Sequence, residues 1–209
     1  VVRVGSEVKG FGLGDRLVVC AANSLRRHFV FDPDLAYTMP FPKDMSAAQA
    51  VVTPLPFIAA MYSVEQLGCL QAGETVLIHH TAAGMSLATI QLAQQKGARV
   101  IVVVQSDAAA AQLSGLAETI NIEHEDLEIA VRALTGGRGV DLVIDAQNKF
   151  AELDVAVLAE FGRLVSISGA GVQRGVTMNG IANRHDVSLL VGDVNNLLVA
   201  RPNCVRQML

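Results

Sequence analysis

Six residues of mostly small side chains, Thr81-Ala82-Ala83-Gly84-Met85-Ser86, lie between an apolar run and a helical pattern. At such a place a turn with the spacing G-x-G-x-x-G holds the pyrophosphate of a dinucleotide. Here that spacing falls on Thr81, Ala83 and Ser86, and Gly84 is the turn's one glycine. Ala83 would bring a methyl group against the pyrophosphate. The turn therefore predicts a degenerate nucleotide site, made of Ala83, Gly84, Met85 and Ser86.

A second candidate segment, Gln105-Ser106-Asp107-Ala108-Ala109-Ala110, follows the next apolar run. In enzymes of this kind an acidic residue there binds the ribose of NAD, or a basic residue accepts the 2′-phosphate of NADP. This segment has no Lys or Arg. Ser106 could donate one hydrogen bond to a ribose, whereas Asp107 would repel a phosphate. A Rossmann-like sheet that binds no nucleotide is the alternative that these residues leave open.

The elements that must position these segments alternate between short apolar runs and helical patterns. We expect strands at 75–79, 99–104, 140–145, 164–167 and 188–191, and helices at 85–96, 107–113, 126–134 and 150–160. Strands separated by helices, with β-branched runs, are typical of a Rossmann-like doubly wound parallel sheet. In this α/β fold, ligands bind beyond the carboxyl ends of the strands.

The first part of the chain is different, with glycines and short alternating runs that suggest strands of a small barrel or irregular sheet. We predict three parts: 1–45 as a partial barrel segment, 46–200 as the Rossmann-like domain, and 201–209 as the start of a following helix. Ser46 is placed to cap the first helix of the second part. The chain opens at Val1 without Met and in what reads as a strand already under way, which favours a piece of a larger protein.

The composition excludes several classes of protein. Hydrophobic residues make up 51% and charged residues 17%, against about 45–50% and about 25% in typical soluble domains, which excludes a disordered chain. The net charge of −4 provides no basic patch, so nucleic acid is not an expected partner. The apolar run at 100–104 is too short to span a membrane, and Pro54 and Pro56 are expected to interrupt the run at 51–61. The cysteines and histidines lack metal-ligand spacing, so no metal site is expected.

Several short motifs occur in one order through nearly the whole chain. They are Val4-Gly5-Ser6 with Gly14-Asp15-Arg16, Gly73–His79, Ile90–Ala93, Thr135–Asp141, Leu158–Arg163 and Arg201-Pro202. In this order they resemble segments of the enoyl reductase domains of iterative fungal highly reducing polyketide synthases, in the medium-chain dehydrogenase/reductase superfamily. The resemblance implies that residues 1–45 are the tail of a GroES-like β-barrel. It also implies an ancestral activity in which NADPH reduces an enoyl thioester.

The departures from that family fall on its functional positions. Its AAGGVG turn corresponds to 81–86 here, and its NSLxG segment near the nicotinamide to 145–149. Its GSxxKR segment, which binds the 2′-phosphate of NADPH, corresponds to 105–110, where both basic residues are alanine. The family's proposed proton-donating lysine corresponds to Gly169. The resemblance retains one candidate catalytic remnant, Asp193.

We therefore hypothesise a degenerate, non-reducing enoyl reductase domain with a structural role in a cytoplasmic, multifunctional synthase of secondary metabolism, as in lovastatin-type nonaketide synthases. No bound cofactor is expected in that case. The alternatives are an active NADPH-dependent reductase of an α,β-unsaturated acyl thioester, and a nucleotide- or acyl-binding module without catalysis. The resemblance implies as partners the neighbouring domains of the same synthase, an acyl carrier protein, a reductase acting in trans and a second copy in a homodimer, and no membrane.

Overall fold

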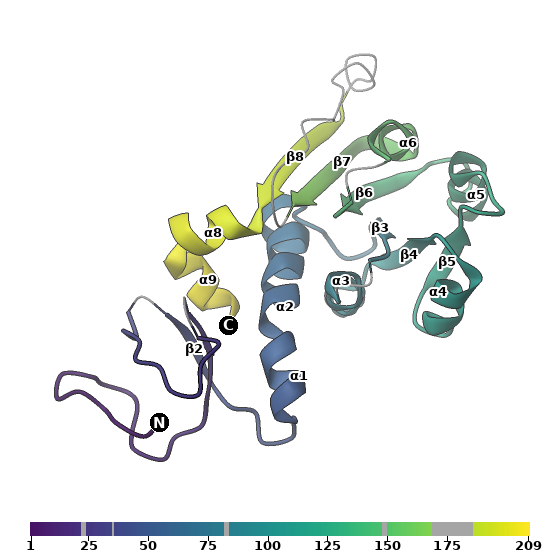
Figure 1. Cartoon of the computed structure of the whole chain (residues 1–209). Helices are drawn as coiled ribbons and strands as arrows, with labels where there is room; N and C mark the ends of the chain where they lie inside the picture. The colour runs from purple at the N-terminus through teal and green to yellow at the C-terminus, as the bar shows by residue number, and fades with distance from the viewer. Residues whose placement is uncertain (22–23, 35, 82–83, 148–149, 169–185) are drawn as a thin grey trace.

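The computed structural model describes the chain except residues 22–23, 35, 82–83, 148–149 and 169–185. Its centre is a six-stranded sheet in the order β5-β4-β3-β6-β7-β8, with all neighbours parallel (Figure 1). The strands are β3 (Thr75–His79), β4 (Arg99–Val104), β5 (Glu118–Asn121), β6 (Val140–Asp145), β7 (Leu158–Ser168) and β8 (Ser188–Asp193). The predicted Rossmann-like α/β fold is confirmed.

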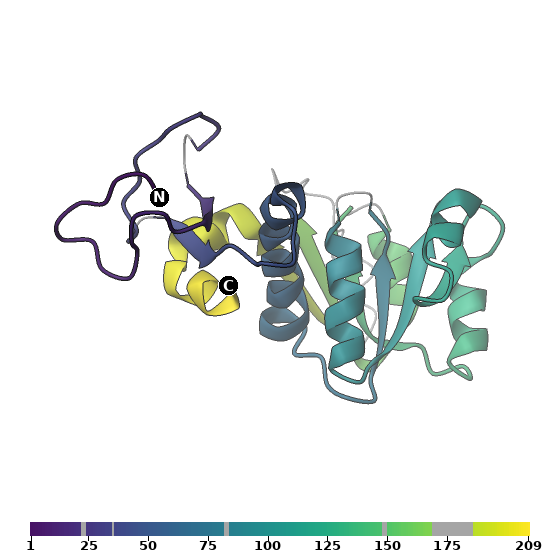
Figure 2. The same ribbon diagram turned by 90° about the horizontal axis from the view of Figure 1, so that it is seen from below.

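The apolar strand residues are divided between two cores, one on each face of the sheet. Alternate side chains of a strand point to opposite faces, so Ile78 packs in one cluster and Leu77 in the other. The first face is covered by α3 (Met85–Gln95) and α4 (Asp107–Gln112), and the second by α5 (Leu127–Leu134) and α6 (Ala151–Ala156) (Figure 2). This burial on both faces explains the continuous apolar runs of the strands.

In the N-terminal part, the described residues form a small antiparallel pair, β1 (Leu17–Cys20) and β2 (Tyr37–Pro40). This part also exposes several large hydrophobic side chains, namely Val2, Val4, Leu13, Leu25 and Val30. The predicted division at residues 45 and 200 remains a prediction.

Three helical segments follow one another closely: α1 (Ala47–Val52), α2 (Pro54–Met61) and the π-helix η1 (Tyr62–Leu67). The expected interruption occurs at Pro54, because α1 ends at Thr53 directly before it, whereas Pro56 lies within α2. Pro54 is the first residue of α2. Proline is tolerated there because the first N–H groups of a helix have no partner within the helix. The run of 21 residues, with mean hydropathy 1.4, is long and apolar enough to cross a membrane by length and composition alone. Such a helix is weak evidence of a span, since core helices share these properties, and α2 packs against α3.

Two further expectations need correction. The helix expected at 150–160 ends at Ala156, and β7 begins at Leu158 because this residue pairs with Val140 of β6. The fold also has a sixth strand, β5, at the sheet edge beside β4, which the sequence pattern did not predict. At the opposite edge, β8 leads into α8 (Val194–Ala200) and then α9 (Pro202–Met208).

Candidate nucleotide-binding site

The turn after β3 has the left-handed backbone that a nucleotide-binding turn needs. Gly84 has φ of 79° and caps α3 without a side-chain hydrogen bond. A side chain at this φ would strain the backbone, so this glycine is required by the turn itself. Met85 begins α3 and Ser86 follows it, as the spacing predicted. Ala83 lies outside the described residues.

The Ser86 side chain hydrogen-bonds to Thr81, at the other end of the turn. It is 2% exposed, and its hydroxyl donates to the Thr81 carbonyl at 3.0 Å, accepts from the Thr81 N–H at 3.3 Å, and lies 3.0 Å from Nδ1 of His80. A glycine at this position would leave those groups to a ligand or to water. The side chain therefore satisfies, within the chain, backbone groups that face the ligand side of the sheet.

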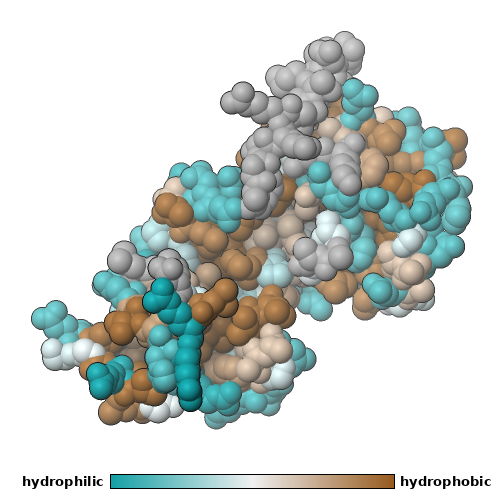
Figure 3. All heavy atoms as spheres, viewed as in Figure 1, coloured by the Kyte–Doolittle hydropathy of each residue, from teal (hydrophilic) through white to brown (hydrophobic). Residues whose placement is uncertain are grey.

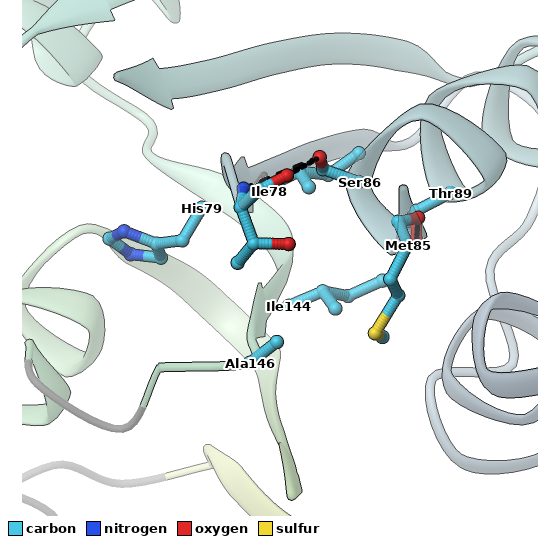
Figure 4. Close-up of a pocket in the computed structure, with 8 residues that line it drawn as sticks. Ile78, His79, Met85, Ser86, Thr89, Ile144 and Ala146 are labelled. Carbon is cyan, nitrogen blue, oxygen red and sulfur yellow. Dashed lines mark hydrogen bonds between the residues drawn. The ribbon is translucent and has the colours of Figure 1, made fainter. Parts of the chain in front are cut away.

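The recess beside the turn is small and partly apolar. It lies between the ends of β3 and β6 and the first turn of α3, and Ile78, Met85 and Ile144 contribute apolar walls (Figure 4). The His79 ring points away from the other labelled side chains (Figure 4). Among the described residues, apolar side chains thus line part of the surface next to the turn.

The end of β4 has the wrong charge for a 2′-phosphate. Ser106 caps α4, and its hydroxyl accepts the Ala109 N–H at 3.2 Å. Asp107 has a side chain that is 82% exposed, with its carboxylate 2.7 Å from the Asn121 side-chain amide and 3.3 Å from Nε2 of His124. Ala109 and Ala110 pack against the apolar cluster of the first face. The segment 105–110, all of it described, therefore offers an exposed carboxylate and no Lys or Arg.

The end of β6 contributes two polar residues. Asp145 is 2% exposed, and its Oδ1 accepts the Gln147 N–H at 2.7 Å. The Gln147 side-chain amide donates to the His80 carbonyl at 2.9 Å and its oxygen accepts from the Gln105 amide at 3.2 Å. Residues after β3, β4 and β6 are thus joined at one edge of the sheet.

Asp193 is far from these residues. It ends β8, three strands away from β3, which corresponds to about 14 Å at the usual spacing of strands. Its Oδ1 accepts the N–H groups of Asn195 and Asn196 at 2.8 and 3.1 Å, so it caps α8. Gly84, Met85, Ser86 and Ser106 are brought together at neighbouring strand ends, and Asp193 is not.

Two polar features were missed by the sequence reasoning. Gln147 was not singled out, because an isolated glutamine after a strand has no characteristic pattern. The buried pair His79 and Asp154 was also missed, although an aspartate between Leu153 and Val155 on an apolar helix was an available signal. Within the described parts of the chain, no group of three or more His, Cys, Asp or Glu could hold a metal ion.

Comparison with known proteins places this geometry among dehydrogenases. The family model described as zinc-binding dehydrogenase matches residues 84–200. The chain is 38% identical over 80% of its length to the hybrid PKS-NRPS synthetase pyvA of Aspergillus violaceofuscus, and 34% identical over 80% of its length to the highly reducing polyketide synthase azaB of Aspergillus niger. It spans 5% and 7% of those proteins. The solved structure of the CurK enoyl reductase matches with TM-score 0.82 and 28% identity, over 99% of this chain and 62% of that one.

Proposed function

The chain belongs to the zinc-binding dehydrogenase family and is an enoyl-reductase-like domain of the polyketide synthase kind, and from this premise we propose that it performs no reduction. Its role is instead architectural, within a cytoplasmic multidomain synthase. The observation that carries this proposal is the buried Ser86 hydroxyl, which accepts the Thr81 N–H in the turn where a cofactor's pyrophosphate would bind.

The residues present do not fit the cofactor that such a reductase uses. The Ser86 hydroxyl accepts the Thr81 N–H at 3.3 Å, so this backbone donor is not free for a phosphate. Hydride transfer needs a cofactor held firmly against the substrate, and the loss of this donor weakens that hold. Zinc does not fit either, since the described residues lack a three-ligand cluster.

The charges at the end of β4 oppose NADPH as well. Hydrogen bonds to a charged group contribute about 1.5–3 kcal/mol each, so the loss of two would weaken binding about a hundredfold or more. Alanine stands at both positions, Ala109 and Ala110, where the resembling family has basic residues. The exposed carboxylate of Asp107 adds repulsion toward a 2′-phosphate.

An architectural role accounts for the apolar surface. Figure 3 shows hydrophobic side chains gathered over α8, α9 and the N-terminal part, and Leu25, Val30 and Val199 are among the exposed residues there. Large exposed apolar patches mark surfaces that other protein covers. The partners in this proposal are neighbouring domains of the same synthase and a second copy. A reductase acting in trans would supply the missing step on the acyl carrier protein.

A titration of the chain with NADPH, followed by nicotinamide fluorescence, tests the proposal. We expect no saturable signal at micromolar NADPH and no oxidation of NADPH with crotonyl thioester. Binding at micromolar NADPH would overturn the proposal, and binding with thioester reduction would establish an active enoyl reductase instead.

The variant that combines Ala83→Gly, Ser86→Gly and Ala109→Lys gives the converse test. It should recover NADPH binding if these positions caused the loss. Circular dichroism would confirm that the variant is folded. A folded variant without an NADPH signal would show that the turn is not the cause.

A further inference from the structure

An apolar pocket lies on the side of α1 and α2 that faces away from α3. It is formed by these two helices, the end of β2 with the loop that follows it, and the end of α9 (Figures 1 and 2). Its volume is about 190 Å³. An apolar cavity of about 150 Å³ has room for benzene, so this pocket has room for a hydrocarbon group of about six carbons. Ten residues, all of them described, line the pocket: Met39, Pro42, Met45, Ala50, Thr53, Pro54, Phe57, Met61, Met208 and Leu209.

The pocket is separate from the candidate nucleotide site. On the other side of α2, Pro56 approaches the turn after β3, where its Cγ would lie 3.7 Å from a Cβ on Gly84. Phe57 and Met61 line the pocket instead. The ten lining residues include no member of the segments 81–86, 105–110 or 145–149. Occupation of the pocket is therefore independent of whether the chain binds a nucleotide.

Methionine is concentrated in the walls of this pocket. Four of the chain's six methionines line it, namely Met39, Met45, Met61 and Met208. The unbranched thioether side chain is flexible and polarisable, and surfaces rich in methionine adapt to apolar ligands of different shape. Walls of this kind suit a flexible alkyl chain.

The walls also limit which part of a ligand can enter. Thr53 is the polar member of the lining, and its hydroxyl already donates to the Gln49 carbonyl at 2.7 Å. The thioester carbonyl of a reductase substrate needs hydrogen-bond donors where negative charge develops on its oxygen, and the other nine lining side chains offer no donor. A polar head group inside the pocket would lose its water without gaining a partner. A ligand therefore places hydrocarbon in the pocket and keeps its polar end in water.

We propose that this pocket binds the tail of a single-chain amphiphile, an unbranched alkyl chain of about six carbons whose polar head remains in water. The site goes beyond the architectural role and requires neither a cofactor nor a catalytic group. Its affinity comes from burial of methylene groups, each of which adds about fourfold.

Nuclear magnetic resonance of the chain, labelled with ¹³C in the methionine methyl groups and titrated with 1-hexanol, tests the proposal. We expect saturable shifts of the signals of the four lining methionines and no shift of Met85, which lies at the nucleotide turn. Affinity should rise about fourfold per methylene from 1-butanol to 1-hexanol. An absence of saturable shifts, an equal shift of Met85 or an affinity independent of chain length would overturn the proposal.

Two sources could supply such a tail, a free acid and an acyl chain held as a thioester. Hexanoate and the hexanoyl thioester of N-acetylcysteamine are compared in the same titration, and the tighter of the two identifies the source. Equal affinities are the expected result, because the tail alone contacts the walls. Binding of the thioester without binding of 1-hexanol would overturn the proposal, since the head group would then be what the chain recognises.

Variants that fill the pocket give an independent test. Ala50→Leu places additional carbons in the pocket and should lower the affinity for 1-hexanol about tenfold or more, as expected when about two methylenes are displaced. Val51→Leu, at a residue of the same helix that is 70% exposed, is the matched control and should change nothing. Because Ala50 is buried, Met45→Trp, at an exposed residue of the lining, is a second filling variant if Ala50→Leu lowers the melting temperature.

Unchanged affinity for 1-hexanol in a folded filling variant would overturn the proposal. A second copy of the chain is the competing occupant of the pocket. Methionine shifts that depend on protein concentration in the absence of 1-hexanol would identify that occupant and would also overturn the proposal. Binding of NADPH, which decides the proposed function, has no bearing on these outcomes.

Discussion

The imidazole of His79 and the carboxylate of Asp154 form a buried pair, with Nε2 and Oδ1 2.6 Å apart and side chains that are 1% and 0% exposed. The pair joins the end of β3 to α6, and Phe150 stacks on the imidazole with ring centroids 5.0 Å apart. The other polar atoms of the pair, Nδ1 and Oδ2, have no hydrogen-bond partner among the described residues. Asp145 is the further charged group that acts on both.

From this pair we predict that the free energy of unfolding falls as pH rises. Burial lowers the pKa of His79, but the hydrogen bond and the charge of Asp154 outweigh burial, so the pKa of His79 is raised. Burial raises the pKa of Asp154 as well. The folded state therefore binds protons more tightly than the unfolded state. The stabilisation is fully present below the unfolded histidine pKa of about 6.5 and is lost as pH rises through the raised pKa of His79.

Urea unfolding at several pH values from 6 to 9 measures this effect. Asp154→Asn should reduce the free energy of unfolding at pH 6 by about 3–5 kcal/mol, because it leaves the buried imidazole without its charged partner. The substitution should also abolish the decline in the free energy of unfolding as pH rises. His124→Asn, which removes an exposed histidine, is the control. A decline of equal slope in the Asp154 variant would contradict the assignment to this pair.

From the contacts of Arg163 we predict a contribution to stability that is lost at acid pH. Its guanidinium holds both oxygens of Glu74 at 2.7 and 2.8 Å and donates to the Gly68 carbonyl at 2.9 Å. The hydrogen bond to Arg163 lowers the pKa of Glu74, so this stabilisation is present above the unfolded glutamate pKa of about 4.3 and is lost as pH falls through the lowered value. Arg163→Lys loses the two-pronged geometry and should cost about 1 kcal/mol at pH 7.

The matched control is Arg99→Lys, since Arg99 makes a similar pair with Glu118 that is more exposed. Its effect should stay within about 0.5 kcal/mol, as is usual for surface pairs. Urea unfolding at pH 7 and pH 4 measures both variants. Equal losses from the two substitutions, or an Arg163 loss that grows toward pH 4, would contradict the prediction.

Two glycines before β6 allow the cost of backbone strain to be measured apart from the cost of steric contact. Gly137 and Gly139 have φ of 86° and 88°. A Cβ on Gly137 would meet nothing within 4 Å, whereas one on Gly139 would lie 2.6 Å from the Val157 carbonyl oxygen. Gly137→Ala should therefore cost about 1–2 kcal/mol from the left-handed backbone alone. Gly139→Ala should cost about 3 kcal/mol or more, because backbone must also move. Melting temperatures measure both, and a similar shift for the two variants would show that the close approach relaxes freely.

The sequence alone predicted the elements whose periodicity is strong. The strands at 75–79, 99–104 and 140–145 occur where the apolar runs placed them, because their burial on both faces requires such runs. The place of the turn and the helix cap at Ser46 followed from local rules of helix entry. The α6 boundary did not, because it depends on the pairing of Leu158 with Val140 of β6, which local preference does not reveal.

The state of the candidate site was decided by the tertiary structure. Sequence spacing showed which glycines are missing, but it could not show that the Ser86 hydroxyl turns inward to Thr81. The three loops that Gln147 joins are distant in sequence, and so are His79 and Asp154. Such contacts depend on which strands become neighbours in the sheet. Local propensity determines the strands and helices, and the order in which the strands pair determines which polar groups meet.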